Sequence, residues 1–160
     1  MEPRIEILAT KKLLGIPMEM SLADNKTSQL WQKFMPRRAE AVHRASSDYL
    51  SMQVYPADEG KIFSPTTRFE KWAAVEVLDY DDVLPSGMEA YLLQGGKYAV
   101  FTHHGPAHDF ARTMVQIFGH WLPASEYQLD QREHFELLPE GYNPMDPDAT
   151  EEVWVPIKPK

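Results

Sequence analysis

Residues 98–122 have the sequence YAVFTHHGPAHDFARTMVQIFGHWL, which indicates an apolar strand followed by an amphipathic helix. The strand covers residues 98–104; a Gly-Pro pair then interrupts the pattern, and Asp109 falls in the first turn of the helix. The apolar residues of the helix recur three or four positions apart on one stripe: Phe110, Met114, Ile117, Phe118, Trp121 and Leu122. Pro123 is expected to end this helix. The stretch therefore predicts a helix that packs on the sheet to which its own strand belongs.

A second helix is predicted over residues 27–45, between two further apolar segments. Its apolar positions are Leu30, Trp31, Phe34, Ala41, Val42 and Ala45. Pro36 lies inside this helix and lacks a backbone N–H, so we expect a kink or a break into two short helices there. Apolar runs or a period of two predict further strands at residues 11–20, 49–55, 69–77, 135–137 and 153–157.

The order of these elements is strand–helix–strand–strand, repeated once. The units are expected at about residues 4–78 and 88–158, and the acidic, Pro- and Gly-containing stretch at 79–87 joins them. Because no residue-level identity links the halves, the repeat is inferred from topology alone. The sequence predicts one domain over residues 1–160, an α/β fold of the α+β type, with both helices side by side on one face of a sheet.

Composition excludes several functional classes. The chain has 24 Asp and Glu against 16 Lys and Arg, a net charge of −8, so we expect no direct binding of nucleic acid. The sequence has no cysteine, which excludes disulfide scaffolds, thiolate metal sites and cysteine nucleophiles. It shows no signal peptide and no apolar run long enough to span a membrane, so a cytoplasmic location is expected.

The alternation along the strands suggests that one face carries aromatic and acidic side chains. The apolar set (Leu50, Met52, Val54, Ala73, Val75, Val77, Phe135, Leu137, Val153, Val155, Ile157) is expected under the helices. The opposite face would then hold Tyr49, Tyr55, Trp72, Trp154 and Glu136. Aromatic rings around a carboxylate would suit a flat, apolar cation. Taken singly, each ring is more often a packing residue, and a strand glutamate is more often solvated.

Other clusters of polar residues are weaker candidates. His103, His104, His108 and Asp109 span a strand end, a turn and a helix start, so their side chains need not converge, and we expect no metal site. The chain contains no Gly-x-Ser-x-Gly motif and no phosphate-binding glycine loop, and we expect no cofactor.

Several stretches together resemble the GyrI-like small-molecule-binding family, the effector domain also fused to AraC-type and MerR-type transcription activators. The similarity covers residues 5–157 and includes residues 69–77, 96–110, the Trp121-Leu122-Pro123 helix end, His134-Phe135-Glu136 and the closing residues 151–157. The resemblance implies a curved antiparallel sheet with two helices on one face and the ligand groove on the other. It also places the glutamate of the groove at Glu136. This sequence departs from the family pattern at Leu138, where the family often has tyrosine.

The leading hypothesis is a stand-alone module that binds amphipathic, cationic or polycyclic small molecules, for drug binding, toxin resistance or effector sensing. Its expected ligand-binding residues are Glu136, Trp72, Trp154, Tyr49, Tyr55, Tyr91 and Tyr142. Similarity to the family leaves two alternatives. One is a hydrolase that opens cyclopropanoid genotoxins, with Glu136 as the catalytic residue that activates water. The other is an interaction protein that inhibits DNA gyrase, its acidic surface imitating the charge of DNA.

Overall fold

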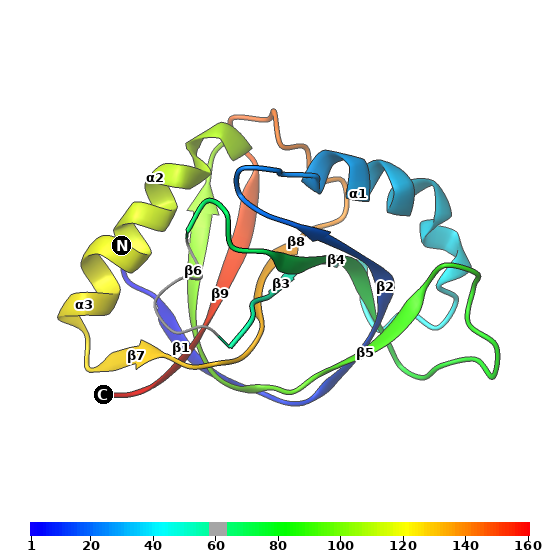
Figure 1. Cartoon of the computed structure of the whole chain (residues 1–160), viewed down its shortest axis with the longest axis horizontal. Coiled ribbons are helices and arrows are strands. Elements are labelled where there is room, and N and C mark those ends of the chain that lie inside the picture. The colour runs from blue at the N-terminus through cyan, green and yellow to red at the C-terminus, as the bar shows by residue number, and fades with distance from the viewer. Residues whose placement is uncertain (58–63) are drawn as a thin grey trace.

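The computed structural model describes residues 1–57 and 64–160, which form an α+β fold (Figure 1). Its strands are β1 (Arg4–Leu8), β2 (Lys11–Met20), β3 (Tyr49–Val54), β4 (Phe69–Val77), β5 (Glu89–Leu93), β6 (Gly96–His104), β7 (Tyr127–Leu129), β8 (His134–Leu138) and β9 (Thr150–Pro159). Its helical segments are α1 (Thr27–Phe34), η1 (Met35–Glu40), η2 (Ala107–Asp109), α2 (Phe110–Met114), η3 (Val115–Trp121) and α3 (Leu122–Ala124). The bounds of β2 and β4 are those expected, whereas β1, β5 and β7 were not predicted.

The sheet is antiparallel, with the strand order β1-β6-β9-β8-β3-β4-β2-β5, and β7 pairs with β9. The predicted strand–helix–strand–strand order is present twice, as β2-α1-β3-β4 and as β6-α2-β8-β9. The two units meet where β3 pairs with β8 and Ser51 lies opposite Glu136. Each unit also receives an edge strand from the other half of the chain, because β1 pairs with β6 and β5 pairs with β2.

Both helices lie on one face of the sheet, as predicted. The strand register shows this, because a continuous row of direct partners points to the same face: Ile16, Ala73, Ser51, Glu136, Val153 and Phe101. One end of this row packs in a core with Leu30 and Phe34 of α1. The other end packs in a core with Ile117 of η3. Figure 1 shows α1 and the α2–α3 segment on the two flanks, with β3 and β8 between them.

The second face of the sheet is buried as well. Trp72, Met52, Phe135 and Trp154 are consecutive partners across β4, β3, β8 and β9, and they form a separate apolar core. The same core includes Leu93 of β5, the last strand of the order, and residues of β6, the second strand from the other end. The sheet therefore curves far enough to enclose this face with its own strands.

The predicted assignment of side chains to the two faces is wrong for part of the apolar set. Five residues of that set do not lie under the helices but share the opposite face with Trp72 and Trp154: Leu50, Met52, Val54, Phe135 and Leu137. Alternation separates the two faces within one strand, but the register decides which faces of neighbouring strands coincide. Because both faces of this sheet are apolar and buried, hydrophobicity gave no signal to choose between them.

Proline interrupts the first helix at the predicted place. Regular α-helix ends at Phe34, and Met35–Glu40 continues as a 3-10 segment with Pro36 at its start. The second helix is continuous through α2, η3 and α3 and has a π-helical middle section. It ends at Ala124, one residue after Pro123.

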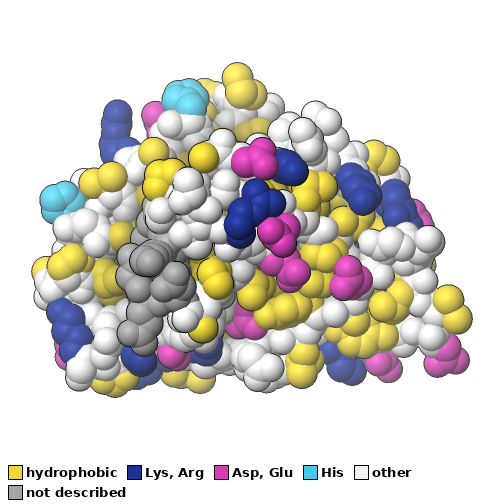
Figure 2. Space-filling view, viewed as in Figure 1, with side chains coloured by type: hydrophobic (Ala, Val, Ile, Leu, Met, Phe, Trp, Pro, Cys, Tyr) yellow, Lys and Arg dark blue, Asp and Glu magenta, His cyan; other side chains and the backbone are white. Residues whose placement is uncertain are grey.

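The surface shown in Figure 2 carries charges of both signs. Among the described residues on that side, Lys and Arg lie singly or in small groups interspersed with Asp and Glu. In the described part of the chain, no helix is both long enough and apolar enough to span a membrane.

Candidate functional site

A cleft of about 1240 Å³ opens on the helix-covered face of the sheet. Its floor is formed by β3, β4, β8 and the start of β9, and its walls by α1, the first turn of α2 and the segment at 139–144. The lining residues are Asn25, Thr27, Ser28, Trp31, Gln32, Met35, Arg38, Tyr49, Ser51, Lys71, Ala107, Phe110, Glu136, Leu138, Pro139, Glu140, Gly141, Tyr142, Pro144 and Glu151. The expectation of a groove on the face opposite the helices is therefore wrong for this cleft, because residues of α1 line it.

Glu136 lies at the centre of the floor. It belongs to β8 and pairs with Ser51 on one side and Val153 on the other, so its side chain points between the two helices. Its Oε2 atom accepts a hydrogen bond of 3.0 Å from Nε2 of Gln53. One carboxylate oxygen is thereby oriented by the sheet itself.

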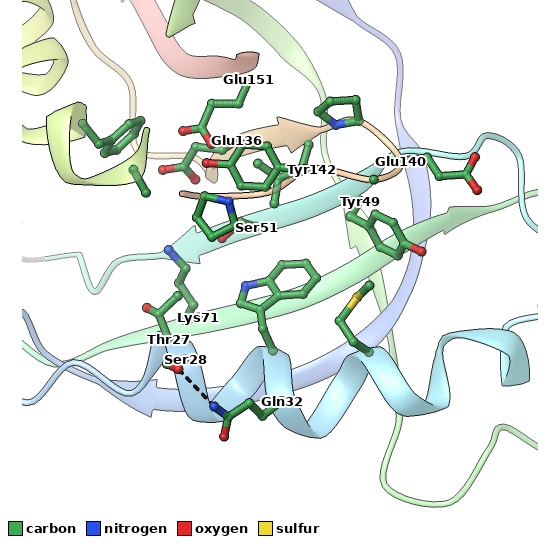
Figure 3. Close-up of a pocket in the computed structure, with 18 of the residues that line it drawn as sticks. Thr27, Ser28, Gln32, Tyr49, Ser51, Lys71, Glu136, Glu140, Tyr142 and Glu151 are labelled. Carbon is green, nitrogen blue, oxygen red and sulfur yellow. Dashed lines mark hydrogen bonds between the residues drawn. The ribbon is translucent and has the colours of Figure 1, made fainter. Parts of the chain in front are cut away.

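Glu151, at the start of β9, places a second carboxyl group beside the first. It is two residues before Val153 and thus on the same face as Glu136, and its exposed fraction is 8%. Figure 3 shows the two carboxyl groups side by side, with Tyr142 next to them. Burial and then the charge of Glu136 raise the pKa of Glu151 to about 7. The hydroxyl of Tyr142 donates a hydrogen bond to Glu151, and this bond and the charge of Lys71 oppose the rise in that pKa.

Lys71 provides the positive charge of the floor. It lies on β4 opposite Gln53 and lines the cleft across from the carboxylates (Figure 3). The charges of Lys71 and one carboxylate cancel, so the second carboxylate decides whether the floor is neutral or negative. Arg38 and Glu140 also line the cleft, and both are exposed.

Aromatic rings form much of the apolar lining. Trp31 of α1 makes an edge contact with Tyr49 of β3, with 6.2 Å between ring centroids. Phe110 of α2 and Tyr142 are the other rings that line the cleft. Burial and the charge of Glu151 raise the pKa of Tyr142, so its phenol remains a hydrogen-bond donor at neutral pH. Rings and carboxylates in one cleft suit an apolar molecule that carries positive charge.

The structure brings three of the predicted ligand-binding residues together in this cleft: Glu136, Tyr49 and Tyr142. Tyr55 lies close by without lining it. The Tyr55 ring contacts Phe69 and His134, and its pKa is raised by burial and then by the charge of Glu136.

Three other predicted residues lie on the opposite face of the sheet. Trp72 contacts the ring of Tyr91 at 5.1 Å and donates a hydrogen bond to Glu70, and Trp154 stacks on Phe135 at 5.2 Å. Only 3% of Trp72 and 8% of Trp154 is exposed. The sheet separates these rings from Glu136. Trp154 is paired with Phe135, the neighbour of Glu136, and neighbouring residues on a strand point to opposite faces.

Most residues of the cleft were not expected from the sequence, and those that matter most for its chemistry are Trp31, Lys71, Phe110 and Glu151. The apolar pattern places Trp31 and Phe110 on helix faces that contact the core, and the structure shows that these faces also border the cleft. Glu151 could have been found by extending the alternation of residues 153–157 back by one step, because residues two apart share a face.

The predicted absence of a metal site remains a prediction. Residues 1–57 and 64–160 contain no group of three or more His, Asp or Glu side chains placed to hold a metal ion. Both ring nitrogens of buried His103 are used within the fold, by Thr113 Oγ1 at 2.6 Å and the carbonyl of Pro106 at 3.2 Å. His108 is exposed and lies 3.7 Å from Asp109.

Fold and cleft together define a small-molecule-binding domain, and comparison with known proteins identifies its family. Residues 1–158 match the model of the GyrI-like small molecule binding domain, and the chain belongs to this family. It is 27% identical over 158 residues to the transcriptional regulator BrlR of Pseudomonas aeruginosa. That match covers 98% of the chain but 56% of the regulator, so the chain spans about half of its relative's length.

Solved structures share this fold. A putative bacterial transcription regulation protein from Staphylococcus aureus superposes with a TM-score of 0.71 at 18% identity, over 99% of both chains. SAV2435, solved bound to tetraphenylphosphonium, gives a TM-score of 0.69 at 18% identity, over 99% of this chain and 94% of that one.

Proposed function

We propose that the cleft binds lipophilic organic cations, with Glu136 and Glu151 as counter-charges and the rings as apolar surface. The observation that carries this proposal is the presence of two neighbouring carboxyl groups in a cleft walled by Trp31, Tyr49 and Tyr142. A carboxylate withdrawn from water lacks part of its solvation, which a cationic ligand replaces and a neutral one does not. Aromatic faces add cation–π attraction.

The size of the cleft supports a bulky ligand. Its volume of about 1240 Å³ lies above the roughly 300–1,000 Å³ usual for small-molecule sites. Tetraphenylphosphonium, the molecule bound to the structural neighbour SAV2435, combines several rings with one positive charge and is a suitable probe. A module of this kind would serve drug binding or effector sensing, and its relative BrlR is a transcriptional regulator.

Isothermal titration calorimetry with tetraphenylphosphonium tests the proposal. Glu136→Gln keeps the shape of the side chain and its bond to Gln53 but removes the charge. We expect about tenfold weaker binding of tetraphenylphosphonium, roughly 1.4 kcal/mol, and little change for neutral triphenylphosphine oxide. Glu152→Gln is the control, because Glu152 lies on the opposite face beside Arg4 and Trp154. Equal weakening of both ligands by Glu136→Gln would contradict the assigned counter-charge.

Hydrolysis is the second candidate function, and the pair of carboxyl groups is the observation that favours it. A carboxylate can deprotonate water while a neighbouring carboxyl group with a pKa near 7 supplies a proton. Incubation with a cyclopropanoid alkylator, followed by mass spectrometry, distinguishes the candidates: turnover to a ring-opened product supports hydrolysis, and retention without product supports binding. Glu136→Gln should abolish any turnover. The gyrase-inhibitor hypothesis stays a prediction without structural support.

A further inference from the structure

Charged and polar groups from several neighbouring elements act on Glu151. Glu136 faces it from β8, the hydroxyl of Tyr142 bonds to it from the loop, and Lys71 acts on it from β4. His103 lies opposite it on β6, but both ring nitrogens of that histidine are bonded elsewhere. From the α2 side, the cleft lining contributes the uncharged ring of Phe110. One carboxylate and one ammonium group therefore offset each other, and the protonation state of Glu151 sets the net charge of the floor.

The two glutamates differ in a way that makes only one of them a proton carrier. Glu136 is only partly buried and accepts a hydrogen bond from the amide of Gln53. Glu151 is more deeply buried and adjoins a like charge, and both features favour its protonated form. A positive ligand in the cleft would reverse this preference, because it supplies the opposite charge that the buried carboxyl group lacks.

We propose that Glu151 exchanges its proton for the positive charge of the ligand. This inference rests on the proposed binding of organic cations and adds a mechanism for it. The free cleft holds Glu151 as a neutral acid; a cation entering the cleft leaves Glu151 as a carboxylate, and one proton passes to solvent. Neutral ligands bind without this exchange, so the cleft accepts both charge classes and selects between them by pH.

The pH dependence has opposite signs for the two ligand classes. The pKa of about 7 in the free protein means that raising the pH ionises Glu151. Affinity for a monocation should therefore rise about tenfold from about pH 6 to about pH 8 and then level off. A neutral ligand excludes water from Glu151 and favours its protonated form, so affinity for triphenylphosphine oxide should fall over the same range.

Calorimetry in two buffers of different ionisation enthalpy measures the exchange directly. Binding of tetraphenylphosphonium should release about half a proton at pH 7 and nearly one at about pH 6. Glu151→Gln should abolish the release and flatten the pH profile, whereas Glu152→Gln should retain both. Lys71→Met removes a cation that lowers the pKa of Glu151, so it should move the release curve to higher pH.

A carboxyl ¹³C NMR titration of the ligand-free protein provides an independent readout. The signal absent from Glu151→Gln should titrate near pH 7. A midpoint in the ordinary glutamate range, or binding of tetraphenylphosphonium without proton release, would overturn the exchange while leaving the proposed function intact. Failure of tetraphenylphosphonium to bind at any pH would overturn the proposed function itself.

Discussion

Trp31 and Trp72 are the same residue type in two different surroundings. Trp31 is half-buried on α1 and faces the cleft, whereas Trp72 is buried on the far face of the sheet with its indole N–H bonded to Glu70. The sequence predicted a trough containing Trp72 and Trp154, because their positions alternate with apolar residues. What sequence could not supply was the register that sets Glu136 beside Val153 and therefore on the face of the helices.

The same substitution should lower ligand affinity at Trp31 and folding stability at Trp72. Trp31→Leu should weaken binding of tetraphenylphosphonium by roughly 1–2 kcal/mol, since it removes ring area and cation–π attraction, and should change stability little. Trp72→Leu should lower the free energy of unfolding by roughly 2–4 kcal/mol and leave the affinity of the folded protein unchanged. Calorimetry and urea unfolding of both variants measure these effects. If only Trp72→Leu lost affinity, the ligand would bind on the face of the sheet opposite the helices, and binding in the cleft would be contradicted.

His134 should make stability depend on pH. Burial and the nearby charge of Arg132 lower its pKa to about 3, so the folded protein keeps the imidazole neutral. The unfolded chain takes up a proton below about pH 6.5, and this contribution to stability is therefore lost as the pH falls from 6.5 toward 3.

The variant His134→Phe keeps a ring against Tyr55 but cannot take up a proton. Below pH 6.5, the free energy of unfolding of wild type should fall with decreasing pH more steeply than that of the variant. The difference between the two slopes should be about 1 kcal/mol per pH unit. Urea unfolding between about pH 7 and pH 4.5 gives this slope. Parallel profiles for the two proteins would show that His134 is protonated in the folded state.

At the scale of elements, periodicity predicted those whose apolar pattern is long. It found β2, β4 and both helices, and Pro36 marked the end of α1. It missed β1 and β5, which are short edge strands with exposed residues and pair with the opposite half of the chain. Such strands carry little hydrophobic signal, since their place depends on distant partners.

Gly15 of β2 is required by the tight packing of the sheet. A Cβ atom there would lie 2.2 Å from the carbonyl oxygen of Ala73, whereas a Cβ on Gly119 of the second helix would lie 3.7 Å from Val115. Gly15→Ala should therefore destabilise the protein by about 3 kcal/mol or more. Gly119→Ala, the control, should stabilise it by roughly 0.5–1 kcal/mol, because alanine favours helix. Thermal unfolding distinguishes the two; a stable Gly15→Ala variant would contradict the strand packing described.

At the scale of the whole molecule, the curvature of the sheet determines where a ligand can bind. The far face is filled by its own side chains, among them Tyr98, Phe135 and Trp154. On the other face, α1 and α2 each cover one half of the sheet and leave β3 and β8 between them open to the cleft (Figures 1 and 3). The sequence predicted an acidic, aromatic site containing Glu136. The identity of the aromatic residues in that site depends on how the two halves of the sheet pair, which the sequence did not reveal.

The location of a bound cation tests this account most directly. Tetraphenylarsonium has the same shape and charge as tetraphenylphosphonium, and its arsenic atom can be located by anomalous X-ray scattering in a crystal of the complex. We predict an anomalous peak in the cleft, between Trp31 and the carboxyl groups of Glu136 and Glu151. A peak on the opposite face of the sheet, beside Trp72 and Trp154, would contradict the account.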